Sequence, residues 1–262
     1  MQTEKMTDSC FIMPILPHKL GNVRDFWDDV SEKYGEDMVN ELKAVGVKRM
    51  MAFLQAIPDK GDFLIMHLQS KDSLDKTLDA MFTKSAKCSS KLKDHFIDFT
   101  GVDLSKKDNR PQLQLLMDWK DKHLYREEKD MLKMPWCFTA PILPGKTEDF
   151  LKLIKEVEKT RMADAENLLR HHDIIRSLTY LQRTPQGDFI VRHIVASNPL
   201  DDLIQSFMAC NDKICLEARK LAKEFMGYDF ANPKNQPHVE LLFKWDESRG
   251  FETADQIIAY TE

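Results

Sequence analysis

The sequence predicts an α+β fold made of two tandem modules, each with the element order β-α-β-β-α-β. The first observation is a repeated strand exit, because residues 10–19 (CFIMPILPHK) return as residues 137–146 (CFTAPILPGK). The second is that this shift of 127 residues (137 − 10) persists along the chain and becomes 126 after one inserted residue, Lys60. The third is that strand and helix patterns alternate in the same order in both halves. We therefore interpret the chain as a tandem duplication of one module.

Each module opens with a strand and a helix. Residues 10–16 form a short apolar run that Pro17 ends, which is typical of a buried strand. Apolar residues then recur at three- and four-residue spacing from about residue 20 to residue 45, which predicts one amphipathic helix. The counterpart helix is expected from Thr147 to about His171.

A β-hairpin follows in each module. Residues 48–57 and 175–184 are rich in alternating apolar residues, and each run ends in a turn signal that contains a glycine, Gly61 or Gly187. Glycine accepts the positive φ that tight hairpin loops require, so a hairpin is predicted in both places. The return strands are expected at residues 62–69 and 188–195.

The remaining elements are a second helical region and a final strand. The helical region is expected to be broken near Lys84 and Asn211 and to end at Gly101 and Gly227, glycines that are placed as helix C-caps. The final strands, which are expected to close each module, are residues 112–119 and 238–245.

The order β-α-β-β-α-β is the ferredoxin-like, or split βαβ, pattern. Such a module carries its helices on one face of the sheet and needs a cover on the other face. We therefore expect the two sheets to pack face to face as an intramolecular α+β barrel, a monomeric pseudo-dimer, with a further homodimer left open. The expected domain boundaries are 1–120 for the first module, 121–135 for a charged linker, 136–246 for the second module, and 247–262 for a tail with a short helix.

The strand exit PILPGK at residues 141–146 and the hairpin LQRTPQGDF at residues 181–189, within this duplicated order, resemble the dimeric α+β barrel superfamily. They are similar to a bacterial branch related to antibiotic-biosynthesis monooxygenases. The resemblance covers nearly all of residues 10–245, although the first half departs from it at His18 and Lys60. The superfamily also includes haem-degrading monooxygenases, chlorite dismutases and dye-decolourising peroxidases, so the resemblance implies a fold without choosing a reaction.

Composition narrows the class of protein. Hydrophobic residues make up 42% and charged residues 31% of the 262 residues, which is typical of a soluble globular protein. The net charge of −5 argues against nucleic acid as a partner. No segment has the apolar length of a signal peptide or a membrane span. Five widely spaced cysteines without a CxxC pair predict reduced thiols, and we expect a cytoplasmic protein.

The period of two along a strand places an arginine, an aromatic residue, a glutamine and a histidine of each hairpin on one face. In the second module these are Arg176, Tyr180, Gln182 and His193, and in the first they are Arg49, Phe53, Gln55 and His67. A register with Thr184 opposite Phe189 would set Tyr180 opposite His193. These polar groups either satisfy one another or line a wet gap between the sheets, or they line a small-molecule pocket.

In a pocket, Arg176 would hold an anionic or enolate oxygen, His193 would move a proton, and Tyr180 would donate a hydrogen bond beside it. These three are the predicted catalytic residues, and Gln182, Arg49, Gln55, His67 and Phe53 are the predicted ligand contacts. We expect the second module to hold the working site, because Tyr180 is replaced by Phe53 in the first. No carboxylate lies at a spacing that predicts a pair with either histidine, and no metal site is predicted.

The predicted function is therefore that of a small-molecule-binding protein, with cofactor-independent, monooxygenase-like chemistry implied by the resemblance. One alternative is a non-catalytic structural or interaction protein. Another is a haem-binding relative, for which His95 is a conceivable helix ligand, although its counterpart is the apolar Leu221. No cofactor is expected, and haem is the second choice. His171 and His172 lie at a predicted helix end, where a cation interacts well with the helix dipole.

Overall fold

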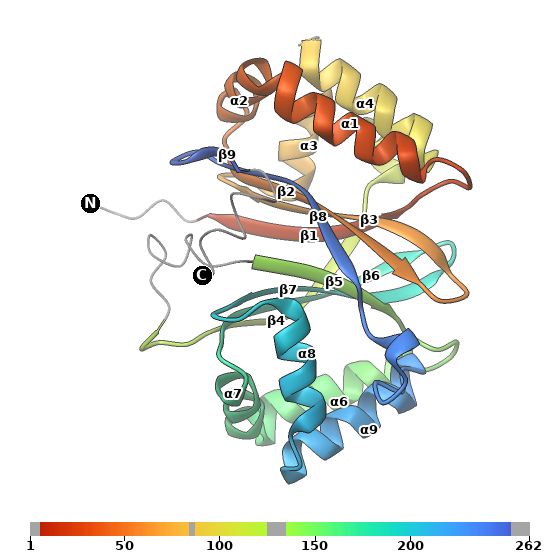
Figure 1. Ribbon diagram of the computed structural model, residues 1–262, viewed down its shortest axis with the longest axis vertical. Helices are drawn as coiled ribbons and strands as arrows, with labels where there is room; N and C mark the ends of the chain where they lie inside the picture. Colours follow the sequence, from red (N-terminus) through yellow and green to blue (C-terminus); the bar gives the residue numbers. More distant parts are fainter. Residues whose placement is uncertain (1–5, 84–86, 125–134, 253–262) are drawn as a thin grey trace. The chain divides into compact units, whose positions relative to one another are not determined.

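The computed structural model describes residues 6–83, 87–124 and 135–252 (Figure 1). The chain divides into two compact units. Unit 1 comprises Met1–Pro111 together with Val239–Glu262, and unit 2 comprises Gln112–His238. No helix among the described residues is both long and apolar enough to cross a lipid bilayer.

Unit 1 is an antiparallel sheet with helices on one side (Figure 1). Its strands are hydrogen-bonded in the order β1-β3-β2-β8-β9. Its elements are β1 (Thr7–Pro14), α1 (Leu20–Lys33), α2 (Gly35–Ala44), β2 (Val47–Ile57), β3 (Gly61–Ser70), α3 (Leu74–Thr83), α4 (Lys87–Thr100), the 3-10 helix η1 (Lys107–Asn109), β8 (Val239–Asp246) and β9 (Gly250–Glu252).

Unit 2 repeats this arrangement with strand order β4-β6-β7-β5. Its elements are β4 (Gln112–Lys120), β5 (Pro135–Pro141), α6 (Thr147–Thr160), α7 (Met162–His171), β6 (Ile174–Thr184), β7 (Gly187–Ala196), α8 (Leu200–Ala209), α9 (Lys213–Met226) and the 3-10 helix η2 (Pro233–Asn235). The predicted α+β class with two tandem modules is thus confirmed. The face-to-face packing of the two sheets stays a prediction.

The cores lie between each sheet and its helices. In unit 2, Leu181 of β6 and Ile190 of β7 cluster with Phe150 of α6 and Phe225 of α9. In unit 1, Trp27 of α1 packs against Phe243 of β8, with ring centroids 4.8 Å apart. Because strand side chains alternate, the neighbours of these residues along each strand point to the face that carries no helices. We call this the helix-free face.

The final strands are exchanged between the sequence repeats. The strand β4 follows the first repeat but pairs with β6, and β8 follows the second repeat but pairs with β2 (Figure 1). The prediction that each final strand closes its own module is therefore wrong. Periodicity along the sequence predicts that a segment forms a strand, but it does not predict which sheet edge the strand joins. The open edges of β2 and β6 are equivalent, so either edge could accept either final strand.

Each predicted long helix is two helices. The first breaks at Tyr34, between α1 and α2, and its counterpart breaks at Arg161, between α6 and α7. At the first break, a Cβ on Gly35 would lie 2.9 Å from the Phe251 ring, so glycine permits this ring to approach the helix. The predicted break near Asn211 is present between α8 and α9. The break near Lys84, most of the linker and the helix of the tail lie outside the described residues.

The cysteines differ from the sequence prediction in one pair. Cys210 and Cys215 form a disulfide with their Cα atoms 6.0 Å apart, so the prediction of reduced thiols is wrong for these two. The end of α8 and the first turn of α9 bring them together, which the spacing alone did not indicate. Cys10 and Cys137 are buried in the equivalent strands β1 and β5.

Gly227 ends α9 in the left-handed conformation, with φ +73°. A Cβ at this position would also lie 3.2 Å from Leu143. We expect Gly227→Ala to lower the free energy of unfolding by about 1–2 kcal/mol, because L-residues are strained there. Gly21→Ala is the matched control, since Gly21 is in the first turn of α1 with nothing within 4 Å of a Cβ. It should instead stabilise by up to about 1 kcal/mol. Urea unfolding of both variants measures the difference, and equal effects would contradict the prediction.

Candidate functional site

The predicted site residues of each module do share one face, and it is the helix-free face. Leu181 packs against helices, so Tyr180 and Gln182 on either side of it point the other way. The same alternation applies to Arg176 on β6 and His193 on β7, and to the equivalent residues of unit 1. The side chains of Arg176, Tyr180, Gln182, His193, Arg49, Phe53, Gln55 and His67 are all buried.

The hairpin register differs from the predicted one by two residues. The loop contains only Pro185 and Gln186, so Thr184 pairs with Gly187. Tyr180 therefore lies opposite Val191, and His193 lies opposite Leu178. A shift of two residues keeps each side chain on the same face, because the side-chain period of a strand is two. Tyr180 and His193 are diagonal neighbours and not the directly facing pair that the sequence predicted.

His67 contacts a carboxylate that the sequence prediction missed. The Nε2 atom of His67 lies 3.1 Å from Oδ1 of Asp8, and the two side chains are 0% and 6% exposed. Gln69 donates a hydrogen bond from Nε2 to the same oxygen at 3.3 Å. The strand β1 begins at Thr7 and not at residue 10, so Asp8 pairs with Gln69 and lies diagonal to His67. One feature of the sequence could have predicted this contact. Asp8 lies two residues before Cys10, so the two side chains share one face if the strand extends back to Asp8.

Arg49 is held by a carboxylate from the exchanged strand. Its Nε atom lies 3.1 Å from Oδ2 of Asp246 at the end of β8, and both side chains are buried. Burial by itself would raise the pKa of Asp246. The hydrogen bonds from the hydroxyl and backbone N–H of Ser248, together with the charge of Arg49, outweigh burial and hold this pKa below its usual value. The result is a buried ion pair.

These residues form two adjacent rows across the sheet of unit 1. One row runs Asp8, Gln69, Arg49, Asp246, and the next runs Cys10, His67, Met51, Lys244. Lys244 is only 3% exposed. We call Asp8, Arg49, His67, Gln69, Lys244 and Asp246 the polar cluster. It combines an imidazole in contact with one carboxylate, a buried ion pair and a buried lysine on a mainly apolar face.

Unit 2 lacks most of this cluster. The positions equivalent to Asp8 and Gln69 are Pro135 and Val195. The positions equivalent to Lys244 and Asp246 are Asp118 and Lys120, which are exposed on the edge strand β4. Arg176 and His193 are present and buried, but the buried aspartate that contacts the histidine in unit 1 has no equivalent. The preference for the second module, which carries Tyr180 where the first carries Phe53, stays a prediction.

His95 lies in the helix layer of unit 1. Its ring stacks on Phe99 and packs at a tilt against Phe26, with centroids 5.4 and 4.4 Å away. Burial lowers its pKa, which favours a neutral, packed imidazole. It is not on the helix-free face with the other candidate residues, and haem as the second-choice cofactor stays a prediction.

The chain matches no protein-family model and no curated protein. Among solved structures it is similar to a candidate monooxygenase from Fusobacterium nucleatum, with 13% identity, a TM-score of 0.46, and coverage of 96% of this chain and 98% of the other. It is similar to an anthrone oxidase-like protein, with 11% identity, a TM-score of 0.46, and coverage of 92% and 94%. It is also similar to a candidate monooxygenase from Lactobacillus acidophilus, with 8% identity, a TM-score of 0.40, and coverage of 95% and 99%.

Proposed function

We propose that the chain binds a small organic molecule with an acidic proton at the polar cluster of unit 1, and that His67 removes this proton. The observation that carries the proposal is the buried contact between His67 and Asp8. A carboxylate against one imidazole nitrogen fixes the tautomer and stabilises the imidazolium that forms when the other nitrogen accepts a proton.

The contact between Asp8 and Nε2 assigns the two nitrogens of His67 different roles. In this proposal Nε2 keeps its proton and donates a hydrogen bond to Oδ1 of Asp8, and Nδ1 acts as the base. The new negative charge on the ligand then lies on a face that also carries Arg49 and Lys244. Arg49 is already paired with Asp246, so its positive charge is partly neutralised. Arg49 and Lys244 should therefore stabilise the ligand anion without making the site bind every anion.

The apolar residues of the same face indicate the body of the ligand. Met51, Phe53, Phe63 and Ile65 alternate onto the helix-free face of β2 and β3 and are buried. They suit an aromatic ring or a conjugated carbonyl compound, whose phenol or activated C–H supplies the proton. The proposed ligand is therefore a phenol or an enolisable aromatic ketone.

The sequence resemblance to cofactor-independent monooxygenases supplies a reaction for such an anion. A deprotonated activated CH₂ group is electron-rich and can reduce dioxygen directly. One O₂ then converts CH₂ to C=O and releases one H₂O. In this proposal the protein supplies the base, the charge environment and the orientation, and the substrate supplies all the electrons.

One observation favours a non-catalytic alternative. The charged groups of the cluster form opposite pairs, Arg49 with Asp246 and His67 with Asp8. Buried networks of this kind also serve to specify strand register without any ligand. The experiment therefore has to separate proton transfer from stability.

A panel of naphthols and nitrophenols, whose absorbance changes on ionisation, tests the proposal. The wild type is expected to bind a member of the panel as its phenolate and to lower the apparent pKa of the ligand by about one unit or more. His67→Gln keeps a polar side chain but removes the base, so the bound ligand should stay neutral. Any oxygen-consuming reaction should slow by about 10²–10⁴-fold, the usual contribution of a positioned base.

His193→Gln, the same substitution at the equivalent position of unit 2, is the comparison. Loss of ionisation with His193→Gln and not with His67→Gln would transfer the site to Arg176, Tyr180 and His193. Failure of the wild type to ionise any ligand, with lower melting temperatures as the main effect of both variants, would favour the non-catalytic alternative.

A further inference from the structure

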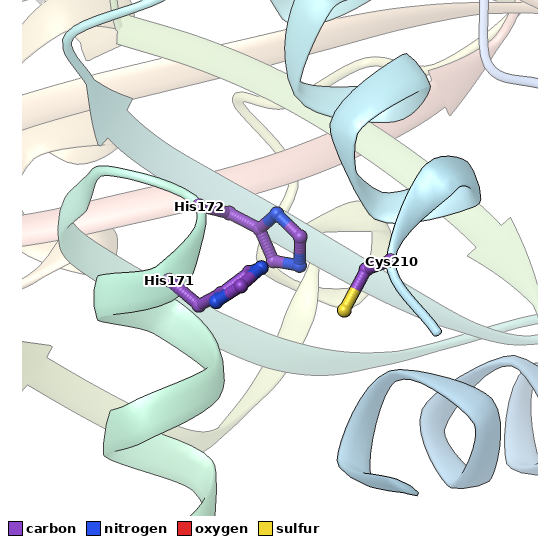
Figure 2. Close-up of side chains that lie close together, drawn as sticks. All are labelled: His171, His172 and Cys210. Atoms are coloured by element: carbon purple, nitrogen blue, oxygen red, sulfur yellow. The ribbon is translucent and has the colours of Figure 1, made fainter. Parts of the chain in front are cut away.

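Four side chains with metal-binding atoms meet where three helices of unit 2 end or begin. His171 is the last residue of α7 and His172 is its C-cap, Cys210 is the C-cap of α8, and Cys215 lies in the first turn of α9. One donor atom from each of His171, His172 and Cys210 lies within 4.8 Å of the others. Figure 2 shows both imidazole rings at the end of α7, with the Cys210 sulfur beside them.

The fourth donor, Cys215, completes the group. Its Sγ atom lies 3.6 Å from Nε2 of His172, and it is bonded to Cys210 in the disulfide. The other nitrogen of His172, Nδ1, lies 2.9 Å from the hydroxyl of Ser206. This contact orients the ring so that Nε2 is directed at the sulfur atoms. A hydrogen bond to the far nitrogen is the usual support for a metal-binding imidazole.

The backbone that carries Cys210 is also held in place. Nη1 of Arg219 donates hydrogen bonds to the carbonyl oxygens of Phe207 and Cys210, at 2.5 and 2.8 Å. These bonds satisfy carbonyl groups at the end of α8, where no helical N–H follows. The position of Cys210 therefore does not depend on the disulfide alone.

We propose that these four side chains bind one Zn²⁺ ion when the disulfide is reduced, so that the disulfide is the metal-free state of a redox-controlled site. Two thiolates and two imidazoles are a common tetrahedral zinc set, and four residues between the cysteines is within the usual ligand spacing. Ligand atoms around tetrahedral zinc lie about 3.3–3.8 Å apart, from the usual Zn–N and Zn–S lengths. The donor atoms of His171, His172 and Cys210 lie within 4.8 Å of one another, and Cys215 Sγ lies 3.6 Å from His172 Nε2, so these separations are close to that range.

The redox step balances with simple reagents. A dithiol reductant gives two electrons and two protons to the disulfide and becomes a disulfide itself, leaving the thiols of Cys210 and Cys215. Zinc binding then releases these two protons. In reverse, a hydroperoxide accepts two electrons and two protons and becomes an alcohol and water. The two thiolates become the disulfide, and Zn²⁺ leaves.

The first module provides an internal comparison. The residues equivalent in sequence to His171, His172, Cys210 and Cys215 are Ala44, Val45, Lys84 and Ser89. None of these is a usual zinc ligand, so the equivalent positions of the first module do not repeat the proposed zinc site. The proposal does not depend on the chemistry proposed for His67, which lies in unit 1.

Cobalt binding to the full chain tests the proposal, because Co²⁺ replaces Zn²⁺ and absorbs visibly. The protein is reduced with a phosphine, and thiols are counted after denaturation. The chain has five cysteines, so the reduced sample should show five thiols and the oxidised sample two fewer. Reduced protein should bind one Co²⁺ with thiolate charge-transfer absorption and strong tetrahedral bands, which Zn²⁺ abolishes. Oxidised protein should show neither band.

Variants locate the site. His172→Gln and Cys215→Ser should each weaken cobalt binding by at least about 100-fold, and Ser206→Ala, which removes only the support of the ring, by about 10–100-fold. Cys10→Ala and the exposed His123→Gln are the matched controls and should bind as the wild type does. Circular dichroism verifies that each variant is folded. Fully reduced wild type without thiolate-to-cobalt absorption would overturn the proposal, as would unchanged affinity in both His172→Gln and Cys215→Ser.

Discussion

Replacing Asp246 by alanine is expected to lower the free energy of unfolding of unit 1 by about 3–5 kcal/mol, the usual cost of leaving a buried charge without its partner. Arg49 contacts Asp246 through Nε at 3.1 Å, and the two side chains are 8% and 2% exposed. The substitution also removes the acceptor for the backbone N–H and hydroxyl of Ser248. Urea unfolding, followed by a probe in unit 1, measures the loss.

Glu247→Ala is the matched control, one residue along the chain. Glu247 pairs with Lys48 nearer the surface, where the side chains of Lys48 and Glu247 are 28% and 37% exposed. Exposed pairs contribute at most about 1 kcal/mol, so this variant should be close to the wild type. The double variant Arg49→Met/Asp246→Leu removes both charges and should recover much of the stability that Asp246→Ala loses. Equal effects of Asp246→Ala and Glu247→Ala would show that burial of the pair contributes nothing.

The same pair gives a pH dependence with a definite sign. The folded-state pKa of Asp246 is below its ordinary value, so the folded protein binds this proton less readily than the unfolded chain. The stabilisation is therefore fully present above the unfolded-state pKa of about 4 and is lost as the pH falls toward the depressed folded-state pKa. Asp246→Ala should lack this part of the acid dependence, and Glu247→Ala should retain it.

A chain that stops at His238 is expected to lose the folded state of unit 1. This truncation removes β8, and with it the side chains of Phe243 and Trp245, which are buried within unit 1. Truncating one large buried aromatic side chain typically costs about 3–5 kcal/mol, and whole domains are stable by only about 5–15 kcal/mol. The open edge of β2 would also invite pairing with other chains. Limited proteolysis should show unit 1 cleaved while unit 2 resists.

A synthetic peptide of residues 238–252 should restore unit 1 when it is added to the truncated chain, because an extended peptide can join an open sheet edge. Trp245 of the peptide should shift its fluorescence to shorter wavelength as it becomes buried. A Trp245→Ala/Phe243→Ala peptide is the control and should not restore protection. Protease resistance of unit 1 in the truncated chain without any peptide would contradict the role assigned to the exchanged strand.

Local patterns in the sequence were sufficient for much of the fold. The apolar runs and glycine turns predicted the strands and both hairpins, and Gly227 ends its helix in the left-handed conformation as expected. The sharing of one face by Arg176, Tyr180, Gln182 and His193 was also predictable, because alternation along a strand is a local property. The predicted register of the second hairpin differs from the observed one by two residues. The side chains still lie on the predicted common face, because the side-chain pattern of a strand repeats every two residues.

The candidate site was predictable only in part. His67 and Arg49 were identified as buried polar residues, but their partners were not, since Asp8 and Asp246 are separated from them by 59 and 197 residues. Each partner comes from a neighbouring strand, so strand pairing decides which carboxylate meets which base. The cluster of His171, His172, Cys210 and Cys215 was missed for the same reason. Its members come from the ends of three different helices.

The sequence by itself determined the element order, the two modules and which polar side chains of each hairpin share a face, because these depend on residues close together along the chain. Only the tertiary structure decided that β4 and β8 exchange places between the sheets, since two equivalent open edges compete for each strand and periodicity favours neither. That exchange brings Asp246 to Arg49. Contacts between distant segments, and not local propensity, therefore give unit 1 a polar cluster that the same module in unit 2 lacks.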